Sequence, residues 1–369
     1  MDYMEQALSL AKLALGQVSP NPAVGALVIR DGEIVGQGYT QPPGSAHAEI
    51  IALRQAGDAA RGSTMYVTLE PCCHYGRTPP CTEAIINAGI SEVHIAMLDP
   101  NTLVGGKGER ELVKNGIRTF IGEHENEARE INEAYIKYIT TGMPFVTAKF
   151  AMSLDGKIAT WSGDSKWISS GGSRRWVHSL RSVTDAIMVG VNTVIADDPQ
   201  LTFRCGERGG IIKKQPFRVI VDTRGRTPSS ARLFGEPGKT ILAMGRPVNP
   251  DVTGVYSQNN AYSQNKVELL ELPMKDGMVD LEELLREIGK REITSVLVEG
   301  GGTLLGSLFD NRLVDKVIAF MAPIIIGGAG AVTAVGGRGV KTVAEAIRLE
   351  NVVTRNCEDD IIISAYVRG

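Results

Sequence analysis

One histidine, one glutamate and two cysteines have the types and spacing that zinc chemistry requires. His47 and Glu49 form a His-x-Glu pair, Cys72 follows a proline, and Cys81 comes after eight further residues. One imidazole and two thiolates leave one of the four usual zinc positions open for water, whose pKa falls to about 7 on the metal. We therefore predict that His47, Cys72 and Cys81 bind Zn²⁺, and that the Glu49 carboxylate carries protons in a hydrolytic reaction.

A fourth side-chain ligand would turn the same residues into a closed structural zinc site. Cys73 or His74 could supply that ligand, so this alternative stays open. The order His-x-Glu, then Pro-Cys, then a further Cys is nevertheless the signature of zinc-dependent nucleobase deaminases. We predict an open catalytic site in which Cys73 is not a ligand, because adjacent cysteines point in different directions.

The composition of the whole chain restricts the class of protein. With 369 residues, 43% of them hydrophobic and 22% charged, the chain is long enough for two globular domains. A net charge of -3 argues against a nucleic-acid coat or a membrane-surface protein. The N-terminus lacks the basic start of a signal peptide, and the most apolar run, residues 317–326, is too short to span a bilayer. We expect a cytoplasmic protein that binds neither nucleic acid nor membrane.

Residues 1–142 alternate helical and strand patterns. Strands are predicted at 23–29, 33–38, 64–69, 93–97 and 117–121. Helices are predicted at 5–15, 47–56, 82–88 and 109–115, with a polar helical connector at 123–141. Such alternation predicts helices on both faces of one sheet. His47 then opens one helix and Cys81 lies at the start of another, where the positive end of the helix dipole favours thiolates.

A second α/β pattern with its own sheet begins at residue 143. Its strands are predicted at 144–152, 186–189, 218–221, 240–243, 295–298, 316–321 and 361–367. Its helices are predicted at 173–181, 281–288 and 303–309. Residues 248–265, rich in Asn, Gln, Ser and Tyr, are predicted to form a surface loop or an insertion. The predicted domains are therefore 1–142 and 143–369.

Five motifs spread over essentially the whole chain resemble one known family. They are PNPAVG at 20–25, EPCCHYGRTPPC at 70–81, DPN at 99–101, SLDGK at 153–157 and VEGG at 298–301. Together they resemble the bifunctional deaminase/reductase family of riboflavin biosynthesis. The resemblance implies an α/β protein with a three-layer α-β-α, cytidine-deaminase-like domain, followed by a dihydrofolate-reductase-like α/β domain.

The resemblance also implies the two reactions. The first domain would use Zn²⁺ to deaminate 2,5-diamino-6-ribosylamino-4(3H)-pyrimidinone 5′-phosphate. The second would use NADPH to reduce the ribosyl group of the product, giving 5-amino-6-(5-phospho-ribitylamino)uracil. The implied partners are this small-molecule phosphate and further copies of the chain in a homo-oligomer. Eight residues separate Cys72 from Cys81, whereas cytidine and tRNA-adenosine deaminases carry Pro-Cys-x-x-Cys, and this difference argues against a nucleic-acid substrate.

Two other functions stay open at this point. One is a deaminase of free or RNA-embedded bases with a degenerate second domain. The other makes the C-terminal half a nucleotide-sensing or assembly module without enzymatic activity. Oxidation of NADPH that depends on the deaminated substrate distinguishes the family function from both, since neither alternative predicts it.

For the deaminase domain, the predicted substrate contacts lie in loops. They are Asn21, His74, Arg77 and Asn101. An amide such as Asn21 both donates and accepts hydrogen bonds, which suits the edge of a pyrimidinone ring. His74, Arg77, Asn101 and also Lys107 are predicted to contact the ribose phosphate, with solvated loop residues as the alternative.

For the reductase domain, a glycine-rich loop and an arginine-rich turn point to phosphate binding. The loop follows the strand at 295–298 and opens a helix, where backbone N–H groups can face a phosphate. In the turn, Thr223, Arg224 and Arg226 suit the 2′-phosphate of NADPH, with an ordinary solvated turn as the alternative. By resemblance, the cofactor contacts are Ala151, Trp167, Thr193, Asp197, Thr223, Gly301, Gly302, Thr303, Leu304, Leu305, Gly306 and Ser307.

The resemblance also places contacts of the reductase domain with its substrate. They are Ser165, Arg181, Leu201, Arg204 and Glu299. Arg181 and Arg204 are interpreted as clamps for the 5′-phosphate of the substrate. Lys149, Asp198 and Glu299 are predicted to act catalytically, by opening the ribose ring and protonating the product.

Two residues near these sites have structural interpretations. Trp167 could equally be a core aromatic side chain. Asp155, within Ser-Leu-Asp-Gly, is predicted to form a turn rather than to act in catalysis.

Overall fold

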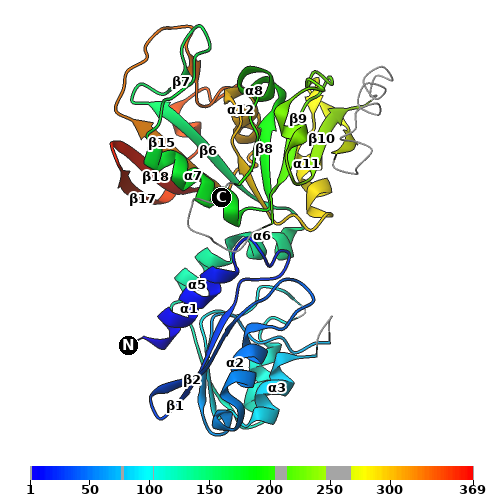
Figure 1. Ribbon diagram of the computed structural model, residues 1–369, viewed down its shortest axis with the longest axis vertical. Helices are drawn as coiled ribbons and strands as arrows, with labels where there is room; N and C mark the ends of the chain where they lie inside the picture. The colour runs from blue at the N-terminus through cyan, green and yellow to red at the C-terminus, as the bar shows by residue number, and fades with distance from the viewer. Residues whose placement is uncertain (1, 76–78, 103, 204–213, 247–266, 369) are drawn as a thin grey trace. The chain divides into compact units, whose positions relative to one another are not determined.

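The chain divides into two compact units, Met1–Met143 and Pro144–Gly369 (Figure 1). The structure is a computed structural model that describes residues 2–75, 79–102, 104–203, 214–246 and 267–368. The division falls one residue beyond the expected boundary at 142. Arg77, Arg204 and the predicted loop at 248–265 lie outside the described residues.

The first unit is built on a five-stranded sheet with the order β2-β1-β3-β4-β5. The strands are β1 (Gly25–Arg30), β2 (Glu33–Tyr39), β3 (Thr64–Val67), β4 (Glu92–Ile95) and β5 (Arg118–Ile121). β1 pairs antiparallel with β2 and β3, whereas β3, β4 and β5 run parallel. Asp31 and Gly32 join β1 to β2 with φ of 51° and 81°. Positive φ at both central residues is what a tight turn needs, so β1 and β2 form a hairpin.

Helices cover both faces of this sheet, as predicted. They are α1 (Tyr3–Ala14), α2 (Ala48–Ala56), η1 (Gly57–Ala60), α3 (Cys81–Ala88), α4 (Lys107–Lys114), α5 (Glu125–Ile131) and α6 (Glu133–Thr141). α1 and α5 lie on one face, and α2 and α3 on the other (Figure 1). Glycines allow a close approach: a Cβ on Gly25 would lie 1.9 Å from the carbonyl oxygen of Ala7 in α1, and one on Gly38 2.4 Å from that of Ala48 in α2.

The connector predicted as one helix at 123–141 forms two helices, α5 and α6, that meet at Asn132. The Asn132 side chain is buried and pairs with the backbone of Ala23. Its Oδ1 accepts a hydrogen bond from the N–H (2.9 Å), and its Nδ2 donates to the carbonyl oxygen (3.1 Å). Because an amide offers the same donor and acceptor as a backbone unit, Asn132 fixes the connector to the segment before β1.

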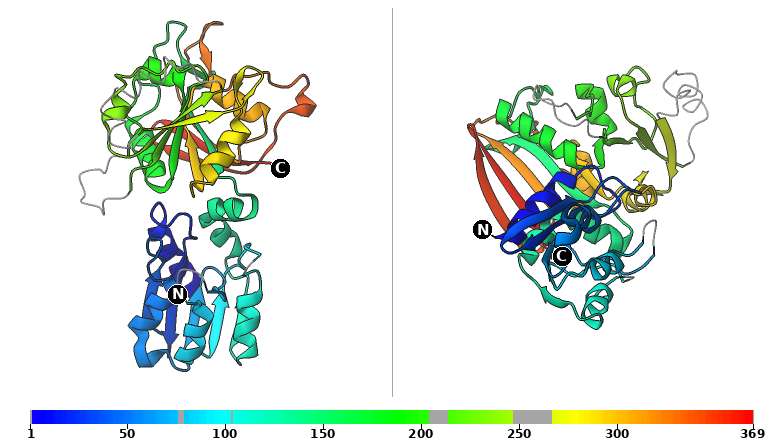
Figure 2. Two further views of the ribbon diagram at one scale, coloured as in Figure 1. Left: turned by 90° about the vertical axis from the view of Figure 1, so that its right-hand side faces the viewer. Right: turned by 60° about the horizontal axis from the view of Figure 1, so that its bottom comes forward.

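The second unit is built on a nine-stranded sheet with the order β11-β10-β9-β8-β14-β6-β15-β18-β17. These strands are β6 (Phe145–Ser153), β8 (Ala186–Gly190), β9 (Phe217–Val221), β10 (Thr240–Gly245), β11 (Val267–Leu272), β14 (Ser295–Val298), β15 (Lys316–Ala322), β17 (Leu349–Cys357) and β18 (Asp360–Val367). Neighbours from β11 to β15 are parallel. β18 and β17 add an antiparallel edge, drawn in red in Figure 2.

Two short strand pairs and several helices complete this unit. The pairs are β7 (Lys157–Ala159) with β16 (Val332–Thr333), and β12 (Met274–Lys275) with β13 (Met278–Val279). The helices are α7 (Gly171–Val183), α8 (Val191–Asp197), η2 (Arg232–Gly235), α11 (Leu281–Gly289), α12 (Gly302–Asp310) and η3 (Val343–Glu345). On α7, Trp176 packs against Phe320 of β15, with ring centroids 5.4 Å apart. In the part of the chain that the structure describes, no helix is long and apolar enough to cross a membrane.

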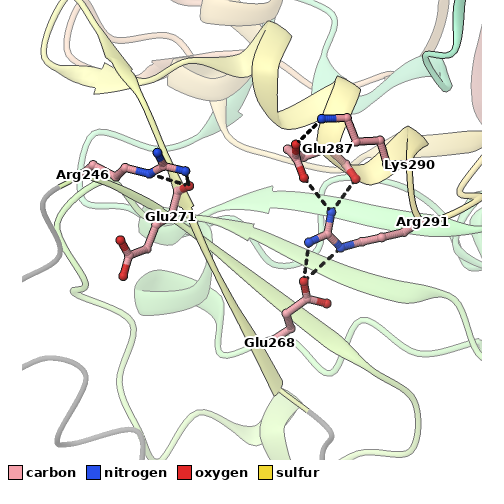
Figure 3. A network of polar contacts seen from close by, with 6 residues as sticks. All are labelled: Arg246, Glu268, Glu271, Glu287, Lys290 and Arg291. Atoms are coloured by element: carbon pink, nitrogen blue, oxygen red, sulfur yellow. Dashed lines mark hydrogen bonds and ion pairs between the residues drawn. The ribbon is translucent and has the colours of Figure 1, made fainter.

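A network of charged side chains joins the end of α11 to β11 (Figure 3). Arg291 donates hydrogen bonds through Nε to Glu268 (3.0 Å) and through NH1 to the side chain of Glu287 (3.1 Å). Nearby, Arg246 donates to the backbone carbonyl oxygen of Glu271 (3.0 and 2.8 Å). Such surface ion pairs contribute little stability individually. The network therefore links the end of α11 to β11 without contributing much to the stability of the unit.

Candidate active sites

The first unit brings His47, Cys72 and Cys81 together at the N-terminal ends of two helices. His47 is the N-cap of α2, and Cys81 is the first residue of α3. Nδ1 of His47 lies 3.2 Å from the sulfur of Cys81 and 3.6 Å from that of Cys72, and the ligand atoms lie within 4.8 Å of one another. Tetrahedral zinc with its usual bond lengths holds such atoms about 3.5 Å apart. The donor set and its spacing therefore fit Zn²⁺, with Nδ1 as the histidine ligand.

Two neighbours of Cys72 stay outside this cluster. Among the described residues, the group that could hold a metal ion contains neither Cys73 nor His74. His74 is exposed, and burial raises the pKa of the half-buried Cys73 thiol. Three protein ligands with a remaining position for water are typical of catalytic zinc rather than structural zinc.

The thiols of Cys72 and Cys81 are electrostatically unequal. The Cys81 thiol donates a hydrogen bond to the Cys72 sulfur, and together with His47 and the Cys81 backbone N–H (3.4 Å) it lowers the pKa of Cys72 to about 4. The same contact, together with burial, raises the pKa of Cys81. Cys72 therefore forms the thiolate, which is the form that binds a metal, more readily than an ordinary cysteine does.

Glu49 lies beside this cluster in the first turn of α2. Its side chain is only 4% exposed, and burial raises its pKa, with the Cys72 thiolate adding to the effect. A carboxyl group whose pKa is raised toward neutrality can both hold and release a proton. These are the two properties that a general acid and base requires.

Glu70 begins the motif at 70–81, but the sequence assigned no function to it. Its buried carboxylate accepts hydrogen bonds from the backbone N–H groups of Asp99 (3.1 Å), Gly106 (2.8 Å) and Glu109 (3.1 Å). Gly108 comes so near the same segment that a Cβ would lie 2.2 Å from the carbonyl oxygen of Pro71. Glu70 therefore joins the zinc-ligand segment to the loop at 99–109. An acidic residue before Pro-Cys gives no sequence signal of these long-range contacts.

Two of the predicted substrate residues lie on the loop that Glu70 holds. Asn101 is half-buried, and its backbone N–H donates to the carboxylate of Asp99 (2.8 Å). The hydroxyl of Tyr135 donates to the same carboxylate (3.0 Å). Lys107 is exposed at the start of α4. Asn21, by contrast, lies in the segment before β1.

The second unit has a cavity of about 470 Å³ at the carboxyl ends of three neighbouring parallel strands, β9, β8 and β14. Ligands of open α/β sheets bind at this edge. The predicted residues that line the cavity are Thr193, Thr223, Arg224, Arg226, Gly301, Thr303, Leu304 and Ser307. The N–H of Gly301, the N-cap of α12, donates to the hydroxyl of Thr193 (3.1 Å). The cavity thus unites the glycine-rich loop with the arginine-rich turn.

Other predicted cofactor residues face away from this cavity. A Cβ on Gly302 would lie 2.6 Å from the carbonyl oxygen of Thr333, and one on Gly306 2.2 Å from the backbone of Gly336. These two glycines let the segment at 333–337 pack directly on α12. Leu305 is fully buried between them.

Trp167 is not a core residue. Its side chain is 73% exposed, and the Arg174 guanidinium lies 4.6 Å from the centre of its ring. The alternative that placed Trp167 in the core is therefore wrong. Nearby, the hydroxyl of Ser165 donates to Asp197 (3.1 Å), so that a predicted substrate residue and a predicted cofactor residue are in contact. Ala151, Trp167 and Asp197 are not among the described residues that line the cavity.

Asp155 forms the turn between β6 and β7, as predicted. Its carboxylate accepts hydrogen bonds from the hydroxyl of Ser153 (2.6 Å) and from the N–H groups of Ile326 (3.0 Å) and Gly327 (2.7 Å). These contacts lower the pKa of Asp155 to about 2. The turn therefore also fixes the segment that follows β15.

Three charged side chains of the second unit influence one another. Arg181 of α7 binds Glu299 in a bidentate pair (2.6 and 2.8 Å), and its NH1 donates to the carbonyl oxygen of Thr202 (3.1 Å). Burial alone would raise the pKa of Glu299, but the charge and hydrogen bonds of Arg181 and the charge of Lys149 together outweigh it, and the pKa is lowered. Burial lowers the pKa of Lys149, which the charge of Glu299 partly opposes. Because Arg181 already orients Glu299, its function as a phosphate clamp stays a prediction.

Asp198 and Leu201 both have backbone conformations that side chains rarely adopt. Their φ values are 41° and 51°. The Asp198 carboxylate accepts a hydrogen bond from the N–H of Arg232 (2.9 Å), and the Leu201 side chain is 3% exposed in a core cluster with Ile187 and Val194. Strained residues of this kind concentrate at functional sites. With its side chain in the core, Leu201 has only its backbone available for a substrate.

Two cations at the cavity have no signal in the sequence. Lys275 reaches it from β12, and Arg338 from the segment beyond β16. Neither lies in a motif or next to a predicted site residue. Only the folding of distant segments onto α12 brings them to the cavity.

Two family models match the chain, one in each unit. The RibD C-terminal domain matches residues 144–363, and the cytidine and deoxycytidylate deaminase zinc-binding region matches residues 1–97. The second match contains the zinc cluster and Glu49. The first contains every residue that lines the cavity.

The chain is also similar over nearly its full length to proteins named riboflavin biosynthesis protein RibD. The relative from Aquifex aeolicus is 41% identical over 98% of this chain and 97% of its own, and the relative from Escherichia coli is 40% identical over 88% of each. A solved structure of Acinetobacter baumannii RibD is 36% identical, with a TM-score of 0.86 over 100% of this chain and 98% of that one. The Thermotoga maritima diaminohydroxyphosphoribosylaminopyrimidine deaminase/5-amino-6-(5-phosphoribosylamino)uracil reductase is 35% identical, with a TM-score of 0.84 over 99% and 98%. The chain therefore belongs to the RibD family of riboflavin biosynthesis, whose members combine a zinc-dependent deaminase with an NADPH-dependent reductase.

Proposed function

We propose that this chain carries out two successive reactions of riboflavin synthesis, one in each unit. Residues 1–142 deaminate 2,5-diamino-6-ribosylamino-4(3H)-pyrimidinone 5′-phosphate. Residues 143–369 reduce the ribosyl group of the product with NADPH, which gives 5-amino-6-(5-phospho-ribitylamino)uracil. The observation that carries the proposal is the zinc-ligand cluster beside the buried Glu49. The same chain also has a cavity lined by Arg224, Arg226 and the N-terminus of a helix, which are groups that suit phosphate. The similar Thermotoga maritima protein is described by both activities.

In the deaminase, His47, Cys72 and Cys81 would hold Zn²⁺, and the bound ion would supply a water molecule of lowered pKa for attack on the amino-bearing ring carbon. Glu49 takes a proton from the water and delivers it to the ring nitrogen. It then takes the second proton from the hydroxyl that has added to the carbon and delivers it to the amino group, which leaves as ammonia. Its burial and raised pKa support this function, because one carboxyl group must hold the proton between the two transfers.

Substrate binding in the deaminase is assigned to loop residues. Asn21 hydrogen-bonds the pyrimidinone edge through its amide. His74, Arg77, Asn101 and Lys107 contact the ribose phosphate. The attachment of the 99–109 loop to Glu70 supports the assignment of Asn101, because it holds this residue beside the zinc-ligand segment.

In the reductase, NADPH supplies the hydride. Gly301, Thr303, Leu304 and Ser307 bind the coenzyme at the start of α12 together with Thr193, because backbone N–H groups at a helix N-terminus favour phosphate. Gly302, Leu305 and Gly306 support this segment from the other side of the helix. Thr223, Arg224 and Arg226 bind its 2′-phosphate. Ala151, Trp167 and Asp197 are the remaining coenzyme contacts that we assign.

A second group of residues is assigned to the part of the site where the ribosyl group of the substrate is reduced. Lys149 protonates the ribose ring oxygen as the ring opens, and its pKa, lowered by burial, favours proton release. Glu299, kept ionised by Arg181, orients the substrate beside it, and Asp198 assists proton transfer. The other assigned substrate contacts are Ser165, Arg181, Leu201 and Arg204.

We further propose that the enzyme is a cytoplasmic homo-oligomer without a nucleic-acid partner. β17 is at the edge of the nine-stranded sheet, and eight of its nine residues are exposed. An exposed edge strand of this length readily pairs with another chain, which supports self-association. Light scattering of the purified protein checks this, and a monomer at micromolar concentration contradicts it.

A coupled assay tests the proposed function. The purified zinc-loaded protein should release ammonia from the diaminopyrimidinone phosphate and then oxidise NADPH. With the deaminated intermediate supplied directly, NADPH oxidation should occur without ammonia release. Ammonia release without substrate-dependent NADPH oxidation would reduce the function to deamination alone.

A further inference from the structure

A buried aspartate closes the turn that presents Thr223, Arg224 and Arg226 to the cavity. Asp222 follows the last residue of β9, and its side chain is 0% exposed. Its Oδ2 accepts two hydrogen bonds from Thr227, one from the backbone N–H (2.6 Å) and one from the hydroxyl (2.7 Å). Asp222 itself does not line the cavity.

The other side of the turn is fixed through Thr223. Its hydroxyl oxygen accepts a hydrogen bond from the N–H of Val279 in β13 (3.2 Å), and its carbonyl oxygen accepts one from the N–H of Gly245 at the end of β10 (3.2 Å). Residues 224–226 therefore form a short loop between two fixed points. Gly225 supplies the positive φ (68°) that the reversal needs.

The two arginines of this loop keep their charges available to the cavity. Arg226 donates to the neutral amide oxygen of Asn192 (2.9 Å), and Arg224 is exposed. Within the described ranges, no carboxylate forms an ion pair with either guanidinium. A phosphate is the anion that two such groups suit best, because the guanidinium fork matches its oxygens.

Burial of the Asp222 carboxylate is incompletely compensated. Its Oδ1 has no hydrogen-bond partner among the described residues. A buried polar atom without a partner costs stability, and its presence in a native fold calls for a reason. The reason we infer is that the hydrogen bonds of the Asp222 carboxylate to Thr227 keep the loop at 224–226 in one conformation.

We propose that Asp222 is a positioning residue for the choice of coenzyme. It does not touch the coenzyme; it holds the turn at 222–227 so that Arg224 and Arg226 meet the 2′-phosphate of NADPH. The inference rests on the proposed use of NADPH in this cavity. It goes further because it assigns coenzyme preference to a residue outside the cavity wall.

Coenzyme titrations of the full-length protein test this inference. Asp222→Ala should weaken NADPH binding by about tenfold, because the arginines lose their fixed direction toward the phosphate. The affinity for NADH, which lacks that phosphate, should change by less than about twofold. Asp222→Asn should keep most of the wild-type affinity for NADPH, since its amide oxygen can accept both hydrogen bonds from Thr227. Thr227→Val keeps the backbone N–H and should cause a smaller loss than Asp222→Ala.

The double variant Arg224→Ala/Arg226→Ala distinguishes this inference from the proposed function. If it loses NADPH selectively while Asp222→Ala binds both coenzymes normally, Asp222 does not position the turn. Equal weakening of NADPH and NADH in Asp222→Ala would assign the residue to the fold of the unit. If the double variant keeps the preference for NADPH, the turn does not bind the 2′-phosphate, and both the coenzyme assignment and the inference are wrong.

Two controls allow the titrations to be interpreted. Deamination in the same preparations should be unchanged, because its residues lie in the other unit. If Asp222→Ala fails to fold, Asp222→Asn and Thr227→Val still decide the question. Thr227→Val should then bind NADPH more weakly than the wild type and NADH equally well, and no change in either coenzyme would overturn the inference.

Discussion

The two sites of this chain are assembled in different ways. The zinc cluster comes from two short segments, 47–49 and 70–81, whose ligands meet at the N-termini of α2 and α3. The reductase cavity takes residues from the ends of three strands, from α8 and α12, from the β12-β13 hairpin and from residues 337–338. Chemistry at a metal needs a few atoms at fixed distances, which local motifs can supply. An extended coenzyme needs contacts from the whole edge of a sheet.

Both sites nevertheless use a buried carboxylate to hold backbone. Glu70 accepts hydrogen bonds from three backbone N–H groups and joins the zinc-ligand segment to a loop. The Asp222 carboxylate accepts hydrogen bonds from Thr227 and closes a single turn. We therefore expect loss of a zinc ligand to be all-or-none. We expect loss of a contact in either supporting network to be graded.

The all-or-none behaviour is tested first at the cysteines. Cys72→Ser should remove the zinc and abolish deamination, because a serine hydroxyl stays protonated at neutral pH and does not replace a thiolate. The matched control, Cys73→Ser, should keep one zinc per chain and full deaminase activity. Metal analysis and ammonia release measure both. A Cys73→Ser protein without metal, beside a metal-replete Cys72→Ser protein, shows that the ligand assignment is wrong.

Glu49 separates proton transfer from metal binding. Glu49→Gln should keep the zinc but lower the deamination rate by about 10²–10⁴, because an amide cannot carry the proton. Reduction of the deaminated intermediate should stay at the wild-type rate, since that site is in the other unit. Loss of both activities in a folded, zinc-replete Glu49→Gln protein would argue against two independent sites.

The same difference in assembly explains what the sequence could predict. The zinc ligands and Glu49 follow from two motifs, and the α/β order of both units follows from hydrophobic periodicity. β17 could not be predicted from the sequence, because eight of its nine residues are exposed and no apolar face alternates along it. The split of the 123–141 connector could not be predicted either, because it depends on hydrogen bonds between the side chain of Asn132 and the backbone of Ala23, more than a hundred residues away.

The cavity shows the same limit for site residues. Thr223, Arg224 and the glycine-rich start of α12 could be recognised because each follows a predicted strand. Lys275 and Arg338 could not, because their segments reach the cavity only through tertiary packing. Arg181 was recognised, but its bidentate pair with Glu299 depends on the meeting of α7 with the end of β14.

The pH dependence of the reductase tests the assignment of Lys149 as its proton donor. Burial lowers the pKa of Lys149 below its ordinary value of 10.5. The ammonium is the proton donor and is present below this pKa, so the reduction rate should fall as pH rises through a value under 10.5. Lys149→Met should lower kcat by about 10² and remove this falling limb, while the Kd for NADPH changes little. A falling limb that persists in Lys149→Met assigns the titration to another group.

Glu70 gives the smallest expected effect and sharpens the comparison most directly. Glu70→Gln keeps the size of the side chain, but it replaces one acceptor oxygen with an NH₂ group that faces an N–H donor. The loop that carries Asn101 and Lys107 should loosen, so KM for the deaminase substrate should rise by about tenfold while kcat falls less. Glu33→Gln changes an exposed residue at the start of β2 in the same unit; it is the matched control and should change neither parameter. Metal analysis decides between two functions of Glu70: with zinc retained it positions the substrate loop, as Asp222 positions its turn, whereas loss of zinc makes it part of the metal site itself.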